Sequence, residues 1–377
     1  MKTSRQHLFY PMVLGLAGLL LACGGARPSE ATLKHKVGQM MMVGFRGTAL
    51  EPANPVIADI REQEIGGIVL YDRDVPSGSS SRNISSPEQL SALVRALKDA
   101  NPGPEPLLIS IDQEGGLVAR LKEKYGFPAP PPSAQSLGTL DDVATTARWA
   151  DLTAATLKDM GINLNFAPVV DLNVNPDCPV IGRLGRSYGL DPSLVVRHAG
   201  VTLDRFRSQG ILGCLKHFPG HGSSTTDSHL GFTDVTNTWS ELELEPYRRL
   251  MAQGNCDLIM TAHIFNARLD ATYPATLSRT IIEGLLRGRL GWQGVVISDD
   301  MMMGAITDQW DLETAIEASI NAGVDMLIFS NNNTVGFDPE IGAKAVKALL
   351  HLVETGRVPQ QRIDESFHRV LALKSKL

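Results

Sequence analysis

Short apolar segments alternate with longer amphipathic segments along most of the chain, and this alternation restricts the possible folds more than any other feature. The apolar segments have the length of strands and carry few polar residues inside them, as strands buried on both faces of a parallel sheet do. Eight such segments occur: QMMMVGF (39–45), GGIVLY (66–71), LLISID (107–112), INLNFAPVVDL (162–172), ILGCLKH (211–217), DLIMTAH (257–263), GVVISDD (294–300) and GVDMLIFS (323–330).

The segments between them, such as 87–100, 140–160 and 193–210, have the periodicity of helices that cover a sheet. Eight strand–helix repeats fit a single (β/α)8 barrel of the TIM type better than an open doubly wound sheet. No GxGxxG motif follows the first strand, which weighs against dinucleotide binding. The sequence therefore predicts an α/β protein built on one barrel.

The first 22 residues have the pattern of an export signal. Lys2 and Arg5 precede an apolar run over 8–22, which is shorter than the roughly 20 residues that a membrane-spanning helix needs. The run ends in Leu-Leu-Ala-Cys, which resembles a bacterial lipobox, so we expect Cys23 to carry a lipid and to become the mature N-terminus. A plain signal peptide with an incidental cysteine is the alternative.

This pattern divides the chain into a signal peptide (1–22), a lipidated cysteine with a flexible tether (23–33) and the barrel domain (34–377). We therefore expect an exported protein that is attached to a membrane through Cys23. Gly24 stands where an aspartate is associated with inner-membrane retention. In a Gram-negative host this predicts the outer membrane, with the barrel facing the periplasm or the cell surface.

Charge and cysteine content exclude some classes of partner. The formal net charge of −6 and the lack of basic clusters argue against nucleic acid, and no segment indicates an obligatory protein partner. Cys178, Cys214 and Cys256 follow Cys23 without the CxxC spacing of a metal site. One disulfide among the three could form in an exported protein, but the sequence predicts no disulfide framework.

Charged or imidazole side chains stand at the ends of five of the eight predicted strands. In barrels of this kind the reacting groups gather at the carboxyl ends of the strands and in the loops that follow. The starts of the strands are mostly glycine or apolar, and this asymmetry predicts an enzyme. The residues at the strand ends are Asp112, Asp171, Lys216, His217, His263, Asp299 and Asp300.

The stretch KHFPGHGSSTTDSH (216–229) covers the end of the fifth strand and the start of a long loop, predicted over about 218–238. Loops of this length in a compact domain are usually functional. The carboxylate of Asp227 can orient the imidazole of His229 and raise its basicity, which suits general acid/base catalysis.

Three other interpretations of this stretch remain. His217, His221, Asp227 and His229 include the ligand types of a zinc site, although Pro219-Gly220 disfavours the helix on which a His-x3-His pair would share a face. A phosphate cradle is weaker, because no glycine-rich helix start follows. A polar loop without chemistry is the last alternative.

Asp299 closes an apolar strand, where a buried carboxylate is costly unless it is paired or used. Such a carboxylate can attack an anomeric carbon and form a glycosyl-enzyme intermediate. Asp300 is the alternative nucleophile or a metal ligand. Because side chains alternate along a strand, we expect only one of the two to face the substrate.

Together and in this order, DQEGGLVARL, GRSYG, KHFPGHG…DSH and SDDMMM resemble glycoside hydrolase family 3, in its β-N-acetylglucosaminidase branch, over roughly residues 34–377. The resemblance implies that Asp299 is the nucleophile and that His229, assisted by Asp227, is the acid/base. It implies neither a metal nor another cofactor. The sugar-binding positions that it implies are Asp112, Arg120, Arg186, Lys216 and His217. For Arg120 and Arg186 a structural ion pair is the alternative role.

The implied activity is that of a retaining exo-glycosidase. It would remove terminal β-N-acetylglucosamine by double displacement, from peptidoglycan fragments, chitin oligosaccharides or similar glycans. The family's β-glucosidases add a second domain with a glutamate acid/base and tend to read SDW, whereas this chain reads SDD and leaves no room for that domain. The alternatives are a phosphorylase or transglycosylase with the same nucleophile, a zinc hydrolase, and a sugar-binding lipoprotein without turnover.

Overall fold

The computed structural model describes residues 31–334 and 336–377. The predicted signal peptide and the predicted lipid attachment at Cys23 lie outside these ranges. Within them, no helix is both long enough and apolar enough to cross a membrane. The fold described below is that of the unit Thr32–Leu377.

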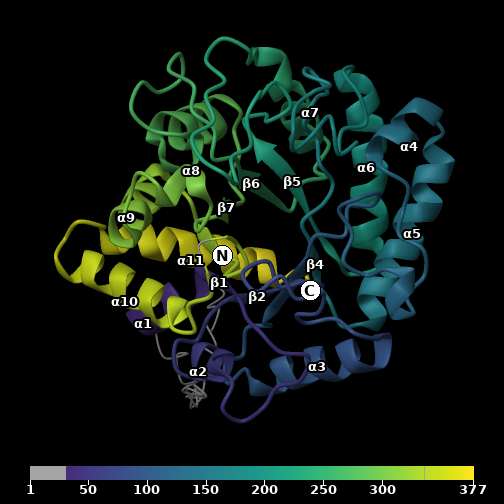
Figure 1. Ribbon diagram of the computed structural model, residues 1–377. Coiled ribbons are helices and arrows are strands. Elements are labelled where there is room, and N and C mark those ends of the chain that lie inside the picture. The colour runs from purple at the N-terminus through teal and green to yellow at the C-terminus, as the bar shows by residue number, and fades with distance from the viewer. Residues whose placement is uncertain (1–30, 335) are drawn as a thin grey trace, which may run out of the picture. The chain divides into compact units, whose positions relative to one another are not determined.

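Eight parallel strands close into a barrel in which each strand pairs with its neighbours in chain order and β8 returns to β1 (Figure 1). This confirms the predicted single (β/α)8 barrel. Every residue of these strands is buried except Asp299, which is half-buried. The strands are β1 (Met41–Gly44), β2 (Gly67–Leu70), β3 (Leu108–Ile111), β4 (Leu164–Asn165), β5 (Leu212–Phe218), β6 (Leu258–Thr261), β7 (Val295–Asp300) and β8 (Met326–Phe329).

Helices surround the barrel (Figure 1), and several begin at the residues that favour helix starts. Ser86 caps α3, Asp142 caps α5 and Asp191 caps α6, each through its side-chain oxygen. The α-helices are α1 (Leu33–Gln39), α2 (Pro55–Arg61), α3 (Pro87–Ala100), α4 (Ala134–Leu140), α5 (Val143–Asp159), α6 (Pro192–Ser208), α7 (Glu245–Ala252), α8 (Gly304–Thr307), α9 (Leu312–Ala322), α10 (Ile341–Glu354) and α11 (Gln360–Lys374). Short 3-10 turns η1 (Glu123–Tyr125), η2 (Glu241–Leu244) and η3 (Ala275–Leu277) and the π-helix η4 (Thr280–Arg289) complete the set.

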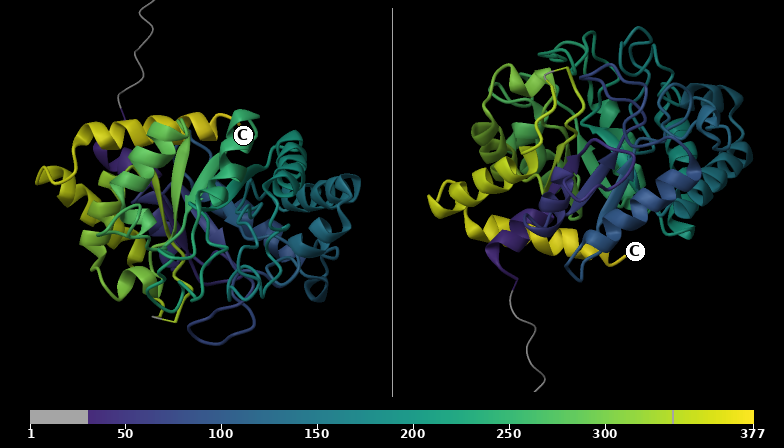
Figure 2. Two further views of the ribbon diagram at one scale, coloured as in Figure 1. Left: turned by 90° about the horizontal axis from the view of Figure 1, so that it is seen from above. Right: turned by 60° about the horizontal axis from the view of Figure 1, so that its bottom comes forward.

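The interior of the barrel is a packed apolar core, closed at the amino ends of the strands by α11. Val370 and Leu373 of α11 pack against side chains that point into the barrel, such as Met42, Leu108 and Val295. Figure 2 shows α11 lying across this end of the barrel. Since this end is filled, the barrel can open to a ligand only at the carboxyl ends of its strands.

Two predicted segments differ from the structure. The segment 162–172 contains only a two-residue strand, because Pro168 lacks an N–H and the chain from Phe166 onward leaves the regular ladder, meeting β5 again at the Val169–Lys216 bridge. The segment 140–160 is not one helix. It breaks at Asp141, which adopts a left-handed conformation, and α5 restarts behind its cap. In addition, Gln39 belongs to α1 and not to the first strand.

Asp325 anchors the amino end of β8, at the end of the barrel that α11 closes. Its fully buried carboxylate accepts hydrogen bonds from Arg287, Arg362 and Arg369 at 2.7, 2.7 and 3.0 Å, and also from Ser366 and the backbone of Val296. These charges hold the pKa of Asp325 below its usual range, in spite of the opposing effect of burial. Removal of the carboxylate would leave three cations close together without their shared anion.

We expect Asp325→Ala to lower the free energy of unfolding by about 3–5 kcal/mol, the usual cost of breaking a buried ion pair. Urea denaturation of the variant measures this loss. Arg357→Ala is the matched control, because Arg357 forms its two ion pairs with Glu313 and Glu317 at the surface. That change should cost less than about 1 kcal/mol. Equal losses in the two variants would contradict a structural role for the Asp325 cluster.

Candidate active site

A cavity of about 540 Å³ opens at the carboxyl ends of the strands, a volume suited to a small ligand. All eight residues that the sequence predicts for catalysis or sugar binding line it. They are Asp112, Arg120, Arg186, Lys216, His217, Asp227, His229 and Asp299. Residues that are far apart in sequence thus meet at one place, because the strands that precede them are parallel and end at the same face.

Asp299 and Asp300 end β7, and their contacts separate their roles. Asp300 accepts hydrogen bonds from the backbone of Met302 and Ser330, at 3.1 and 2.9 Å, and from the Ser330 hydroxyl. The carboxylate of Asp299 accepts only from the backbone N–H of Asp300, at 2.8 Å, among the contacts of the described residues. Both line the cavity, which differs from the expectation that only one would, but Asp299 is the one with free acceptor capacity.

The protonation states of the two aspartates also differ. Burial raises the pKa of Asp299, but the imidazoles of His217, His263 and His229 outweigh burial, so the net shift is downward. For Asp300 burial prevails and the pKa is raised. Asp299 therefore remains an anion at neutral pH, which a nucleophile requires.

One wall of the cavity is a chain of alternating charges from the loop after β3, the loop after β4, and β5. Lys216, whose side chain is 2% exposed, lies 2.8 Å from Asp112 and 2.7 Å from Glu114. Asp112 also accepts from Arg120 at 3.3 Å, and Arg186 donates two parallel hydrogen bonds to Glu114 at 2.7 and 2.8 Å. The ion pair considered for Arg186 therefore exists, and its side chain still reaches the cavity.

These ion pairs fix the charges of the wall. Burial alone would raise the pKa of Glu114, but Arg186 and Lys216 lower it to about 2. Burial would lower the pKa of Lys216, but Asp112 and Glu114 raise it. The wall therefore keeps its three cations and two anions charged at neutral pH, and it offers fixed donors and acceptors to a polyhydroxylated ligand.

His217 joins this wall to a buried aspartate of the loop after β4. Its Nδ1 lies 2.7 Å from the carboxylate of Asp171, while its Nε2 lies 3.3 Å from Arg186. Asp171 also accepts from the backbone N–H of His217 and, at 2.8 Å, from that of His221. The sequence placed Asp171 at a strand end, but did not predict that it would hold the start of the loop after β5.

The loop after β5, from residue 219 to 240, has no helix or strand and carries the predicted acid/base pair. His229 Nδ1 lies 2.7 Å from Asp227 Oδ1, and the His229 side chain is 59% exposed. Partial desolvation of the ring by the surrounding protein lowers the pKa of His229, but the hydrogen bond to Asp227 and the charge of Asp299 outweigh it, and the net shift is upward. The predicted pairing of Asp227 with His229 is thus present.

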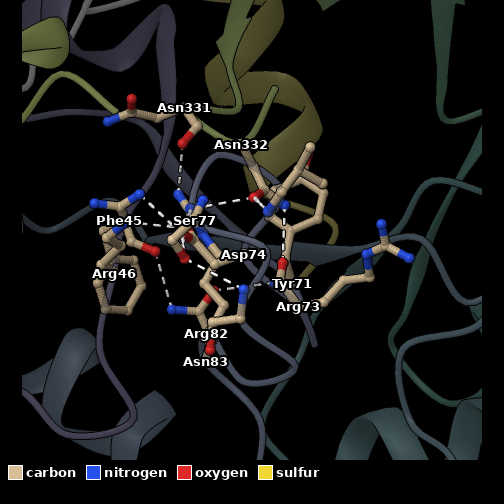
Figure 3. A network of polar contacts seen from close by, with 12 residues as sticks. Phe45, Arg46, Tyr71, Arg73, Asp74, Ser77, Arg82, Asn83, Asn331 and Asn332 are labelled. Atoms are coloured by element: carbon tan, nitrogen blue, oxygen red, sulfur yellow. Dashed lines mark hydrogen bonds and ion pairs between the residues drawn. The ribbon is translucent and has the colours of Figure 1, made fainter. Parts of the chain in front are cut away.

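Loops after β1, β2 and β8 form another part of the rim (Figure 3). Asp74 accepts hydrogen bonds from Arg46, at 2.8 and 3.0 Å, and from the buried Arg82, which also donates to the backbone of Asn331 at 2.8 Å. This network ties the three loops together. Arg73, next to Asp74, points away from the network and lines the cavity (Figure 3).

The zinc interpretation of the 216–229 stretch is not supported. Both ring nitrogens of His221 are engaged with serine hydroxyls, and Nδ1 of His217 faces Asp171. Across residues 31–334 and 336–377, no three histidine, cysteine, aspartate or glutamate side chains are arranged to hold a metal ion. Cys178, Cys214 and Cys256 are separate buried thiols.

Comparison with known proteins identifies the family. Residues 32–373 match the glycosyl hydrolase family 3 N terminal domain. The chain belongs to this family. A beta-hexosaminidase from Tolumonas auensis is 36% identical over 298 residues, which cover 78% of this chain and 83% of that protein. Beta-hexosaminidase LpqI from Mycobacterium tuberculosis is 32% identical over 362 residues, covering 92% of this chain and 84% of the relative.

Solved structures agree with these relatives. A glycoside hydrolase family 3 beta-N-acetylglucosaminidase from Paenibacillus sp. superposes with a TM-score of 0.82 at 37% identity, over 92% of this chain, which spans 62% of that protein. Beta-N-acetylhexosaminidase from Beutenbergia cavernae gives 0.82 at 29% identity, over 92% of this chain and 100% of its own. The predictions of family 3, of its β-N-acetylglucosaminidase branch and of a β-N-acetylhexosaminidase enzyme are confirmed.

The raised pKa of His229 gives a prediction on pH dependence. If the imidazolium is the required form, kcat/KM falls as pH rises through the pKa of His229 in the free enzyme. Asp227→Asn removes the carboxylate that raises this pKa, so the alkaline limb of the kcat/KM profile should move to lower pH. Asp234→Asn is the control: it lies on the same loop, its carboxylate accepts a hydrogen bond from the backbone N–H of Thr236, and its replacement should leave the limb in place. An unchanged limb in Asp227→Asn would contradict the pairing.

Proposed function

We propose that this protein is a retaining exo-β-N-acetylglucosaminidase that acts by double displacement, with Asp299 as the nucleophile. The observation that carries the proposal is the environment of Asp299. Its carboxylate lines the cavity, is held in the charged form by three imidazoles, and has unused acceptor capacity. The retaining and exo modes follow the resemblance to family 3 and the relatives' names.

In the first step Asp299 attacks the anomeric carbon while the glycosidic oxygen takes a proton from the His229 imidazolium. The bond to the leaving group breaks and a glycosyl-aspartate forms. Asp227 supports this step because it favours the protonated imidazole. In the second step neutral His229 removes a proton from water, which attacks the anomeric carbon and frees Asp299.

The charged wall is proposed to bind the non-reducing sugar. Asp112 accepts from sugar hydroxyls, and Arg120, Arg186, Lys216 and His217 donate to hydroxyl or acetamido oxygens. Each of these groups already has a protein partner, so its position is set before the substrate arrives. A preorganised polar site loses little free energy in reorganising on binding.

The natural substrate and the location of the protein belong to the same proposal. Peptidoglycan fragments, chitin oligosaccharides and similar glycans all present a terminal β-N-acetylglucosamine. The pattern of residues 1–33 supports export and a lipid at Cys23, and Gly24 supports the outer membrane. Such an enzyme would meet its substrate outside the cytoplasm.

Turnover of two matched substrates tests the activity. We expect the protein lacking residues 1–23 to hydrolyse 4-nitrophenyl β-N-acetylglucosaminide in preference to the β-glucoside, without forming sugar 1-phosphate when phosphate is added. Asp299→Asn should reduce the rate by about 10⁴-fold, as loss of a nucleophile does. Asp300→Asn is the control. It changes the carboxylate that Ser330 binds and should reduce the rate far less than Asp299→Asn does. Formation of sugar 1-phosphate when phosphate is added would indicate a phosphorylase. The absence of turnover of either substrate would indicate a binding protein.

Leaving-group dependence tests the role of His229. His229→Ala should slow a substrate with a poor leaving group, such as di-N-acetylchitobiose, by about 10²–10⁴-fold, because general acid catalysis contributes this much. The activated 4-nitrophenyl glycoside needs little protonation and should lose far less in the step that forms the intermediate. Equal losses with both substrates would count against His229 as the acid.

A further inference from the structure

His221 is buried next to the catalytic loop, and the proposed reaction does not use it. Its side chain has both ring nitrogens in hydrogen bonds. Nδ1 lies 2.9 Å from the hydroxyl of Ser224, and Nε2 lies 3.0 Å from the hydroxyl of Ser228. Ser228 stands between Asp227 and His229, so this imidazole contacts the backbone segment that carries the acid/base pair.

The segment around His221 is fixed to the barrel. The backbone N–H of His221 donates to Asp171 at 2.8 Å, and Asn175 donates to the carbonyl of Ser224 at 2.8 Å. A Cβ on Gly222 would lie 1.7 Å from the carbonyl oxygen of Leu172, so the chain here packs directly on the backbone of the loop after β4. His221 therefore has a fixed position from which it can hold something else.

The segment beyond it, residues 225–230, is exposed apart from the half-buried Asp227 and the buried Ser228. Thr225, Thr226, His229 and Leu230 are exposed, whereas Ser228 is only 2% exposed. Ser228 is buried because its hydroxyl turns inward to His221. Without this bond the exposed segment would have few contacts to hold its position.

The other side of the loop is docked on the turn that follows the nucleophile. The backbone N–H groups of Gly304 and Ala305, at the start of α8, donate to the carbonyls of His229 and Ser228, both at 3.2 Å. A Cβ on Gly304 would lie 3.0 Å from the Gly231 nitrogen, so the two segments are in close contact. The pair that carries the proton is thus held between His221 and the segment that follows Asp299.

The chemistry of His221 suits a fixed tether. Burial, the main cause, and the neighbouring His217 lower its pKa to about 4, against the opposing charges of Asp171 and Asp299. The ring stays neutral at working pH, so one nitrogen donates and the other accepts. Serine hydroxyls can do either, and both bonds are satisfied in either tautomer.

We propose that His221 is a positioning residue, which through the hydroxyl of Ser228 holds the Asp227–His229 pair over the cavity. This inference rests on the proposed acid/base role of His229. It gives the second histidine of KHFPGHG a task in the reaction without metal binding or proton transfer. A displacement of about 1 Å in a catalytic group can lower a rate by about a hundredfold, so a single hydrogen bond of this kind can matter.

The test is Ser228→Ala, which removes the tethering hydroxyl and changes none of the catalytic residues themselves. We expect kcat for di-N-acetylchitobiose to fall about 10- to 100-fold, with much smaller changes in its KM and in turnover of the 4-nitrophenyl glycoside. The control is Thr226→Val, which removes a hydroxyl from the same loop that bonds Thr233 and not His221. It should change neither substrate's kcat by more than about twofold.

A second pair of variants addresses folding and rescue. His221→Gln keeps an amide that can reach Ser228 and should retain more of the chitobiose activity than His221→Ala. Hydrogen exchange of residues 225–232 should increase in Ser228→Ala while the strands keep their protection. If Ser228→Ala loses activity equally on both substrates, or if neither its hydrogen exchange nor its activity changes, the proposed positioning role of His221 is wrong. If His229→Ala itself shows no leaving-group dependence, the acid/base assignment fails instead.

Discussion

The arrangement of the active site depends on the hydrogen bonds that the carboxylate of Asp171 accepts. It lies on the irregular segment after β4 and accepts hydrogen bonds from the backbone of His217, the ring of His217 and the backbone of His221. Burial of an anion is costly, and these N–H groups and the neighbouring imidazoles offset the cost and keep its pKa low. From this carboxylate one branch leads through His217 to Arg186 and the charged wall. The other leads through His221 to Ser228 and the acid/base loop.

The two branches solve different physical problems. The charged wall of the cavity has to be rigid. Its side chains are held in place because ions of opposite sign alternate along it, as Lys216 does between Asp112 and Glu114. In the proposed reaction His229 changes its protonation state in each cycle, so it cannot be locked into a buried ion pair. Its 59% exposed side chain has one carboxylate partner and access to water, which the second step of the proposed reaction consumes.

The sequence predicted the barrel well because strands buried on both faces are almost continuously apolar, and this pattern is recognisable even in short segments. All eight strands lie inside or within one residue of the predicted segments. β4 is the exception in length, because it is much shorter than its predicted segment. Its apolar pattern continues to Leu172, since these residues are buried, but burial alone does not produce a ladder, and Pro168 cannot donate to one. Periodicity reports burial, and it reports hydrogen bonding only indirectly.

The position of candidate site residues was predictable where the residue type is uncommon at the end of a buried strand. Asp299, Lys216 and His217 are of this kind, and the structure places them at the cavity. Glu114 was missed although it stands two residues from Asp112, because nothing in DQEGG shows that its partners come from β5 and from the loop after β4. Pairings between residues so distant in sequence are set by the closure of the barrel, and one sequence does not contain them in a readable form.

His221 shows the same limit from the other side. In the sequence its neighbours are two further histidines and an aspartate, so metal binding is a reasonable interpretation of composition. In the structure the decisive neighbours are two serines, Ser224 and Ser228, which composition would assign to a solvated loop. The imidazole sits where the anchored part of the loop meets its exposed part. A neutral ring with one donor and one acceptor can join these parts in either tautomer. A charged group at this position would have needed a buried counter-ion in addition to Asp171.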